Sequence, residues 1–153
     1  MEYGSCGRSV VSMTATHVNI IDRSSEKAHI WVNDLAVELG TEDRQAAYRI
    51  LRAFLHVLRD RLPVNEAAQL AAQLPLLVRG IFFENWEPSS TPQRYRDPAE
   101  FLGRVAAAAL LHGETEASYA VTAAAAVLRR RVSVGEIEDV MRVLPDPIRA
   151  LLL

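Results

Sequence analysis

Cysteine and lysine are almost absent from this 153-residue sequence, and neither sign of charge dominates it. The one cysteine, Cys6, cannot form an intramolecular disulfide or supply a multi-cysteine zinc site, which favours a reducing cytoplasm over secretion. The formal net charge of −2 gives no electrostatic reason to expect a polyanion, so nucleic acid is not the expected partner.

Long apolar runs are missing as well. The uncharged stretch 117–128 is too short and too rich in alanine to span a bilayer. Residues 1–23 lack the basic start and apolar block of a secretory signal. We therefore expect a soluble, cytoplasmic protein with no membrane partner.

The chain is rich in arginine, in alanine and in hydrophobic residues generally. It contains 16 arginines, a single lysine (Lys27) and 22 alanines, and half of its residues are hydrophobic. The arginines could indicate phosphate recognition, but a GC-rich genome favours arginine and alanine codons together and is the simpler explanation. The apolar residues are ample for a core, in one compact domain or in two small halves that share it.

Apolar residues three and four positions apart predict helices from Ser25 to the end of the chain. Ser25 and Thr41 are expected to cap the first two helices, which Gly40 and Pro63 end. An aspartate, a proline and a glutamate within 97–100 mark a later helix start. The predicted segments are a flexible tail over 1–24, four helices over 25–83, a connector over 84–96 and further helices over 97–153.

One phrase of the sequence returns seventy residues later. LRDRLPVNEAAQLAAQLPLLVRG occupies 58–80, and LRRRVSVGEIEDVMRVLPDPIRA occupies 128–150. A constant shift of 70 aligns 31–81 with 101–151 without gaps, which indicates an internal repeat. We therefore predict an all-α fold of about eight helices, in two four-helix repeats that are related by a pseudo-twofold axis and share one core.

The residues that recur in this register mark helix ends. Arginines in a last turn oppose the negative end of the helix dipole, and a proline stops a helix. We further expect each recurring glutamate to form an ion pair with the recurring arginine near it. The expected pairs are Glu66 with Arg79 and Glu136 with Arg149. The recurring pairs are Arg59/Arg129, Arg61/Arg131, Glu66/Glu136, Pro75/Pro145 and Arg79/Arg149.

The phrases LRDRLP, EAAQLAAQLP and RGIFFENW, followed by a weaker second copy, carry a family resemblance. They resemble the bacterial family catalogued as domain of unknown function 2267, over about residues 28–151. The resemblance implies a small all-helical protein of two related halves. It implies no activity, cofactor or catalytic residue. The N-terminal extension departs from the short start that is usual in the family.

The sequence contains no catalytic or metal-binding pattern. Its four histidines lack the i,i+4 spacing of a helical zinc site. His56 and Asp60 are expected to form an ordinary pair on an exposed or boundary helix face. We therefore predict no enzyme activity, no cofactor and no metal site.

The leading functional hypothesis is a non-catalytic module that binds a protein partner or self-associates. Apolar residues at 18–21 and 151–153 support it, and nucleic-acid or regulatory binding through arginine-rich helix ends is the alternative. The residues that could contact a partner are Arg59, Arg61, Arg129, Arg130, Arg131 and Trp86.

A second alternative is small-ligand binding in a gap at Ala124–Ala126. The gap is expected because the bulkier residues 54–56 align with these three alanines in the repeat register. Interiors pack densely, so the lost volume must be compensated. The aromatic residues Phe82, Phe83 and Trp86 are the expected filling, and closer helix packing or an open groove are the other solutions.

Overall fold

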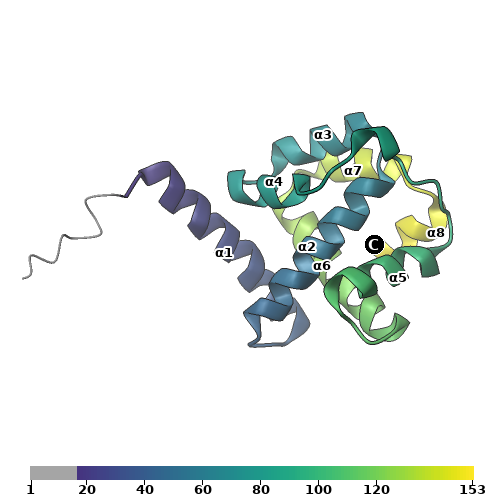
Figure 1. The fold of residues 1–153 in the computed structure, drawn as a ribbon, viewed down its shortest axis with the longest axis horizontal. Coiled ribbons are helices and arrows are strands. Elements are labelled where there is room, and N and C mark those ends of the chain that lie inside the picture. Colours follow the sequence, from purple (N-terminus) through teal and green to yellow (C-terminus); the bar gives the residue numbers. More distant parts are fainter. Residues whose placement is uncertain (1–16) are drawn as a thin grey trace, which may run out of the picture.

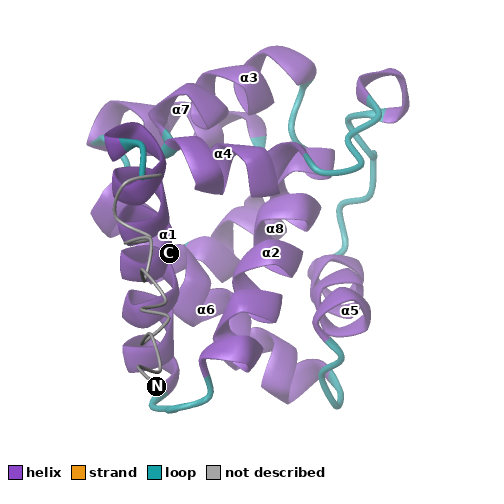
Figure 2. Cartoon of the chain, turned by 60° about the vertical axis from the view of Figure 1, so that its left-hand side comes forward, coloured by secondary structure: helices purple, strands orange, loops and turns teal. Residues whose placement is uncertain are grey.

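The structure is a computed structural model that describes residues 17–153, and it is all-helical over that range (Figures 1 and 2). This confirms the predicted fold class and the number of helices. None of the helices in this range is both long enough and apolar enough to cross a membrane. The elements are α1 (Asn19–Leu39), α2 (Arg44–Arg61), α3 (Val64–Gln73), α4 (Leu76–Phe83), η2 (Pro88–Ser90), α5 (Pro98–Ala109), α6 (Glu114–Arg131), α7 (Val134–Val143), α8 (Asp146–Arg149) and η3 (Ala150–Leu152).

Helix α1 begins at Asn19, earlier than the predicted start at Ser25. Ser25 lies inside the helix and does not cap it, and Asp22 in the first turn suits the positive end of the helix dipole. Gly40 ends the helix as predicted, in the left-handed conformation with φ 64°. The predicted tail over 1–24 is thus helical from Asn19 onward, and its first sixteen residues lie outside the described range.

Helix α2 is capped by Asp43 and not by Thr41. The Asp43 carboxylate accepts a hydrogen bond from the backbone N–H of Ala46 at 3.0 Å. The Thr41 hydroxyl accepts one from the N–H of Asp43, so it stabilises the turn before the helix. The helix stops at Arg61, before Pro63, as predicted.

Helix boundaries recur at a spacing of seventy residues. Helices α2 and α6 span 44–61 and 114–131, and α3 and α7 begin at 64 and 134. Helices α1 and α5 are each followed by a left-handed residue, Gly40 with φ 64° and Leu110 with φ 59°. The pseudo-twofold relation of the two halves stays a prediction.

The two halves interleave in the core. Helix α5 packs mainly against α2 and α6, and α1 packs mainly against α6 and α2 (Figure 2). The fully buried rings of Phe54 on α2 and Phe101 on α5 meet edge to face, with centroids 6.5 Å apart. A single hydrophobic cluster draws on both halves, so each half covers apolar surface of the other.

The alanine face of α6 is filled. Ala124 and Ala125 are 1 % and 2 % exposed. Helix α6 packs mainly against α1, α5, α2 and η3, whereas α4, which carries Phe82 and Phe83, packs mainly against α1, α2 and α3. The packing therefore supports close helix approach over the predicted filling by aromatic residues.

The connector between the halves is fastened to the bundle. The Gln93 N–H donates to the Asp60 carbonyl, and Arg61 Nε donates to the Tyr95 carbonyl, both at 2.8 Å. The guanidinium groups of Arg61 and Arg104 each lie over the Tyr95 ring, with their central carbons 5.7 Å and 4.7 Å from its centroid. Burial raises the pKa of Tyr95 to about 12, against the opposing effect of the two arginines.

Candidate functional site

Arg59 was predicted to face a partner, but it is 3 % exposed. Its Nη1 donates to the carbonyl oxygens of Phe82 and Glu84, each at 2.7 Å, and its Nε donates to the Asp60 carboxylate at 2.8 Å. The guanidinium therefore holds the end of α4 against α2. Arg61 is also buried, at 8 % exposed, and holds the connector through Tyr95.

The three arginines at the end of α6 are engaged as well. Arg129 donates to the carbonyl oxygen of Leu152, which ties the C-terminal turn to α6. Arg130 pairs with Glu38, and Arg131 Nε donates to Asp34 at 2.7 Å. These two ion pairs join α6 to α1 across the halves. The five arginines consequently do not form one free basic face on the described part of the chain.

Trp86 packs against the bundle and is half-buried. Its ring lies 5.0 Å from that of Phe83, and both side chains pack against the hydrophobic core. Trp86 therefore contributes to the packing of the bundle, and its contact with a partner stays a prediction.

His56 was expected on an exposed or boundary face, paired with Asp60; it does lie at the boundary, but the pair does not form. The ring is half-buried, and its Nε2 lies 2.6 Å from the carbonyl oxygen of Ile81. Burial lowers the pKa of His56, an effect that the nearby Arg59 and Arg52 reinforce and the hydrogen bond to Ile81 opposes. The neutral ring therefore donates this hydrogen bond and fastens α4 to α2.

The expected pairs of Arg79 with Glu66 and of Arg149 with Glu136 do not form. Arg79 Nε donates to the Ala71 carbonyl at 2.9 Å, and Arg149 Nη2 donates to the Leu144 carbonyl at 3.0 Å. Each arginine thus satisfies carbonyl groups at the end of the preceding helix, where orphan acceptors are found.

The two glutamates instead lie on α3 and α7, which pack against each other. One carboxylate oxygen of each is buried without a hydrogen-bond partner in the described part of the chain. Burial raises the pKa of Glu136, and the charges of Glu66 and Asp139 raise it further. No group of three or more His, Cys, Asp or Glu side chains within 17–153 is placed to hold a metal ion.

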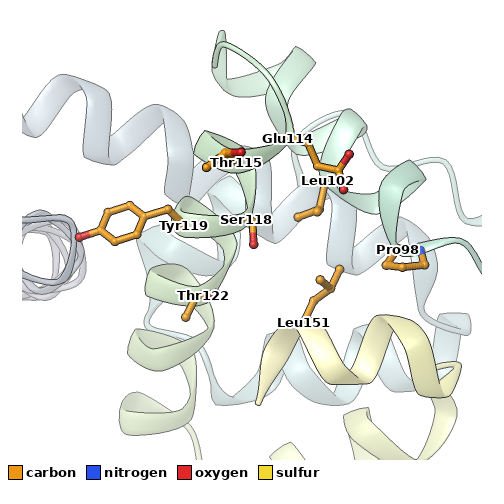
Figure 3. A pocket seen from close by; sticks show the side chains of 8 residues that line it. All are labelled: Pro98, Leu102, Glu114, Thr115, Ser118, Tyr119, Thr122 and Leu151. Carbon is orange, nitrogen blue, oxygen red and sulfur yellow. The ribbon is translucent and has the colours of Figure 1, made fainter.

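A cleft of about 730 Å³ opens between α5, α6 and the C-terminal turn (Figure 3). Leu102, Ser118 and Leu151 point toward a common space, whereas Tyr119 points away from it, and its hydroxyl lies 3.4 Å from the Glu38 carbonyl. The residues that line the cleft are Pro98, Leu102, Glu114, Thr115, Ser118, Tyr119, Thr122 and Leu151.

The chemistry of the cleft is an apolar wall that faces a row of hydroxyls. Leu102 and Leu151 supply apolar surface, and Thr115, Ser118 and Thr122 follow one another along α6. The three hydroxyls form no hydrogen bond within the described part of the chain. Glu114 is the only ionisable acid or base among the described lining residues apart from the Tyr119 phenol, so the cleft favours a cationic group over an anionic one.

At the cleft, small residues stand where the first half carries larger ones. Positions 115, 118 and 122 on α6 correspond in the seventy-residue register to Gln45, Tyr48 and Arg52 on α2. Arg52 reaches Glu84 with its Nη2 at 3.1 Å, so that side of α2 is occupied. The same register that aligned 54–56 with 124–126 also contains these size differences, so they were the signal in the sequence for this cleft.

The two apolar segments predicted from the sequence, 18–21 and 151–153, differ in how much of their surface is exposed. Leu152 is buried at 2 % exposed and Leu151 lines the cleft, so only Leu153 of the C-terminal leucines projects, at 73 % exposed. Ile20 and Ile21, in the first turn of α1, are 61 % and 63 % exposed. The N-terminal end of α1 is therefore the more extensive apolar surface.

Residues 28–151 match the model of a family described as an uncharacterized conserved protein, DUF2267. A comparison with curated proteins finds no match. The matched residues include the cleft and the five arginines, and they begin after the first turns of α1.

Proposed function

This chain belongs to the DUF2267 family, and we propose that it is a non-catalytic helical module that binds a partner protein in the α5–α6 cleft. The cleft itself is the observation that carries the proposal. Its volume of about 730 Å³ falls in the range of binding clefts, and its polar groups lie beside apolar surface. The proposed setting is the cytoplasm of a bacterium, which the lone Cys6 and the arginine- and alanine-rich composition support.

The partner that fits this chemistry is an apolar segment that bears a basic residue. Leu102 and Leu151 would contact its apolar side chains, and Glu114 would face its cation. The hydroxyls on α6 are short enough to let a backbone approach, and they are free to hydrogen-bond to it.

The two alternative functions have less support. Nucleic-acid binding would require Arg130 and Arg131 to exchange their partners on α1 for phosphates. Ligand binding at Ala124–Ala126 would require displacing packed helices, because Ala124 and Ala125 are buried.

The test uses two synthetic helical peptides with the same apolar residues, one carrying lysines and the other glutamates. Binding is followed by the NMR methyl resonances of Leu102 and Leu151 in the full chain. We expect the lysine peptide to shift these resonances and the glutamate peptide to bind more weakly. Glu114→Gln should reduce the preference about two- to fivefold, as expected for an exposed charge pair. The charge control is Glu87→Gln, at an exposed acid outside the cleft.

A filled cleft gives the stricter test. Ser118→Tyr with Thr122→Arg places on α6 the residues that α2 carries at the corresponding positions, Tyr48 and Arg52. The double variant should keep the helical circular dichroism spectrum and lose the peptide-induced shifts. If both peptides bind the double variant as they bind the parent chain, the cleft is not the binding site.

A further inference from the structure

The first two turns of α1 and the start of α4 form an exposed apolar surface, which we call the tip. Monomeric soluble proteins seldom leave so many large apolar side chains exposed together. The α1 end of the tip projects from the bundle (Figure 1). The residues of the tip are Val18, Ile20, Ile21, Leu76 and Leu77, with 53 %, 61 %, 63 %, 57 % and 46 % of their areas exposed.

The tip is exposed because α1 extends beyond the helices that cover it. The inward stripe of α1 runs through Ile21, Ala28 and Leu35 at seven-residue intervals. Ala28 and Leu35 are 8 % and 0 % exposed, whereas Ile21, on the same stripe, is largely exposed. Helix α5 is the counterpart of α1 in the seventy-residue register. It begins only at Pro98, which corresponds to Ala28, so it has no match for the first turns of α1. The stripe therefore continues past the core, and no helix among residues 17–153 covers it there.

The tip combines a hollow with projecting side chains. An apolar hollow of about 430 Å³ is lined by Ile21, Ser24, Ser25, Leu76 and Leu77. Ser24 and Ser25 are the small residues of its lining, and Ile20, one turn before Ser24 on α1, is 61 % exposed. A surface with a knob next to a hollow can receive a copy of itself about a twofold axis, since each copy then supplies both parts.

We propose that the tip is the interface of a homodimer, in which a second copy of this chain covers it with its own tip. The charges around the tip support this choice of partner. Asp22 and Glu26 balance Arg23 and Lys27, so the segment has no net charge and each copy offers both signs to the other. An anionic membrane or a nucleic acid would meet two carboxylates together with the two cations.

This interface goes beyond the partner binding proposed for the cleft. The two surfaces share no residue, so either proposal can fail without the other.

The test is sedimentation velocity on the full chain between about 5 and 500 μM, the range in which modest interfaces associate. We expect a reversible monomer–dimer equilibrium. Ile21→Lys and Leu77→Lys should each weaken the dimer at least tenfold. Val37→Lys is the matched control, because Val37 is 78 % exposed on the same helix outside the tip, and it should leave the equilibrium unchanged.

Disulfide trapping gives an independent readout. In a Cys6→Ser background, Ser25→Cys should yield a covalent dimer under oxidation, and Val37→Cys should not. A chain that stays monomeric over the whole range overturns the proposal, as does a dimer that both lysine variants leave intact. Co-sedimentation of a monomeric chain with phosphatidylcholine–phosphatidylglycerol vesicles, lost in Ile21→Lys, would assign the tip to a lipid surface and would also overturn it.

Discussion

Replacing Arg59 with alanine removes the side chain that holds the end of α4 on α2. The guanidinium is 3 % exposed, and its Nη1 donates to the carbonyl oxygens of Phe82 and Glu84 at 2.7 Å each. A hydrogen bond from a charged donor is worth about 1.5–3 kcal/mol, and a buried acceptor left unpaired costs about 1–3 kcal/mol. We therefore expect Arg59→Ala to lower the free energy of unfolding by about 3–5 kcal/mol.

Urea unfolding followed by circular dichroism at 222 nm measures this change, and thermal unfolding provides a second readout. For a chain of this size the loss corresponds to a melting temperature lower by about 6–20 °C. Arg59→Lys should be intermediate, because an ammonium keeps the charge but lacks the planar fork of donors. Arg130→Ala is the control, since the Arg130–Glu38 pair is partly exposed and should contribute less than about 1 kcal/mol.

The comparison of the two alanine variants decides the role of Arg59. If Arg59→Ala and Arg130→Ala each change the free energy of unfolding by less than about 1 kcal/mol, Arg59 does not clamp α4. The partner contact predicted for Arg59 from the sequence would then regain support.

Two further variants test the helix ends and the buried carboxylates. Leu110→Gly should raise the free energy of unfolding by about 0.5–1 kcal/mol, measured by urea unfolding, because Leu110 is exposed and left-handed with φ 59°, where glycine carries no steric penalty. Glu136→Gln should raise it by about 1 kcal/mol at pH 7.5, because the neutral amide can donate to the Glu66 carboxylate. Because the pKa of Glu136 is raised on folding, the folded state binds more protons than the unfolded state. The free energy of unfolding of the wild-type chain therefore falls as the pH rises from about 4.5 through the raised pKa of Glu136. The advantage of Glu136→Gln should therefore shrink toward pH 4, and an advantage that does not change with pH would contradict the assignment.

The helix ends were largely predictable because their signals are local. Gly40, Pro63 and Asp97 act within one turn of the residue that they terminate or cap, and the structure places helix ends at all three. The start of α1 was missed for the same reason. Ser25 supplies a cap signal that the chain does not use, and the residues before it carry no strong signal of their own.

The roles of the arginines could not be predicted from local signals. Arg59 and Arg61 occupy the last turn of α2, where a solvated side chain that opposes the dipole is the usual outcome. Their burial depends on carbonyl groups more than twenty residues away, at Phe82, Glu84 and Tyr95. Only the tertiary fold brings those acceptors within reach, so a sequence pattern on α2 alone overstates how exposed these residues are.

Both candidate surfaces lie where positions seventy residues apart differ in size or where the matching helices differ in length. The cleft opens where Ser118 and Thr122 stand against Tyr48 and Arg52 of the first half, and the tip exists because α1 begins well before the position that matches the start of α5. Arg79 and Arg149, which agree in the register, each donate to backbone carbonyl groups of their own half, and that role is structural. If the halves were equivalent in every position, both surfaces would vanish or both would be duplicated. The search for a partner should therefore begin at these two differences, and the recurring arginines are the place to test stability.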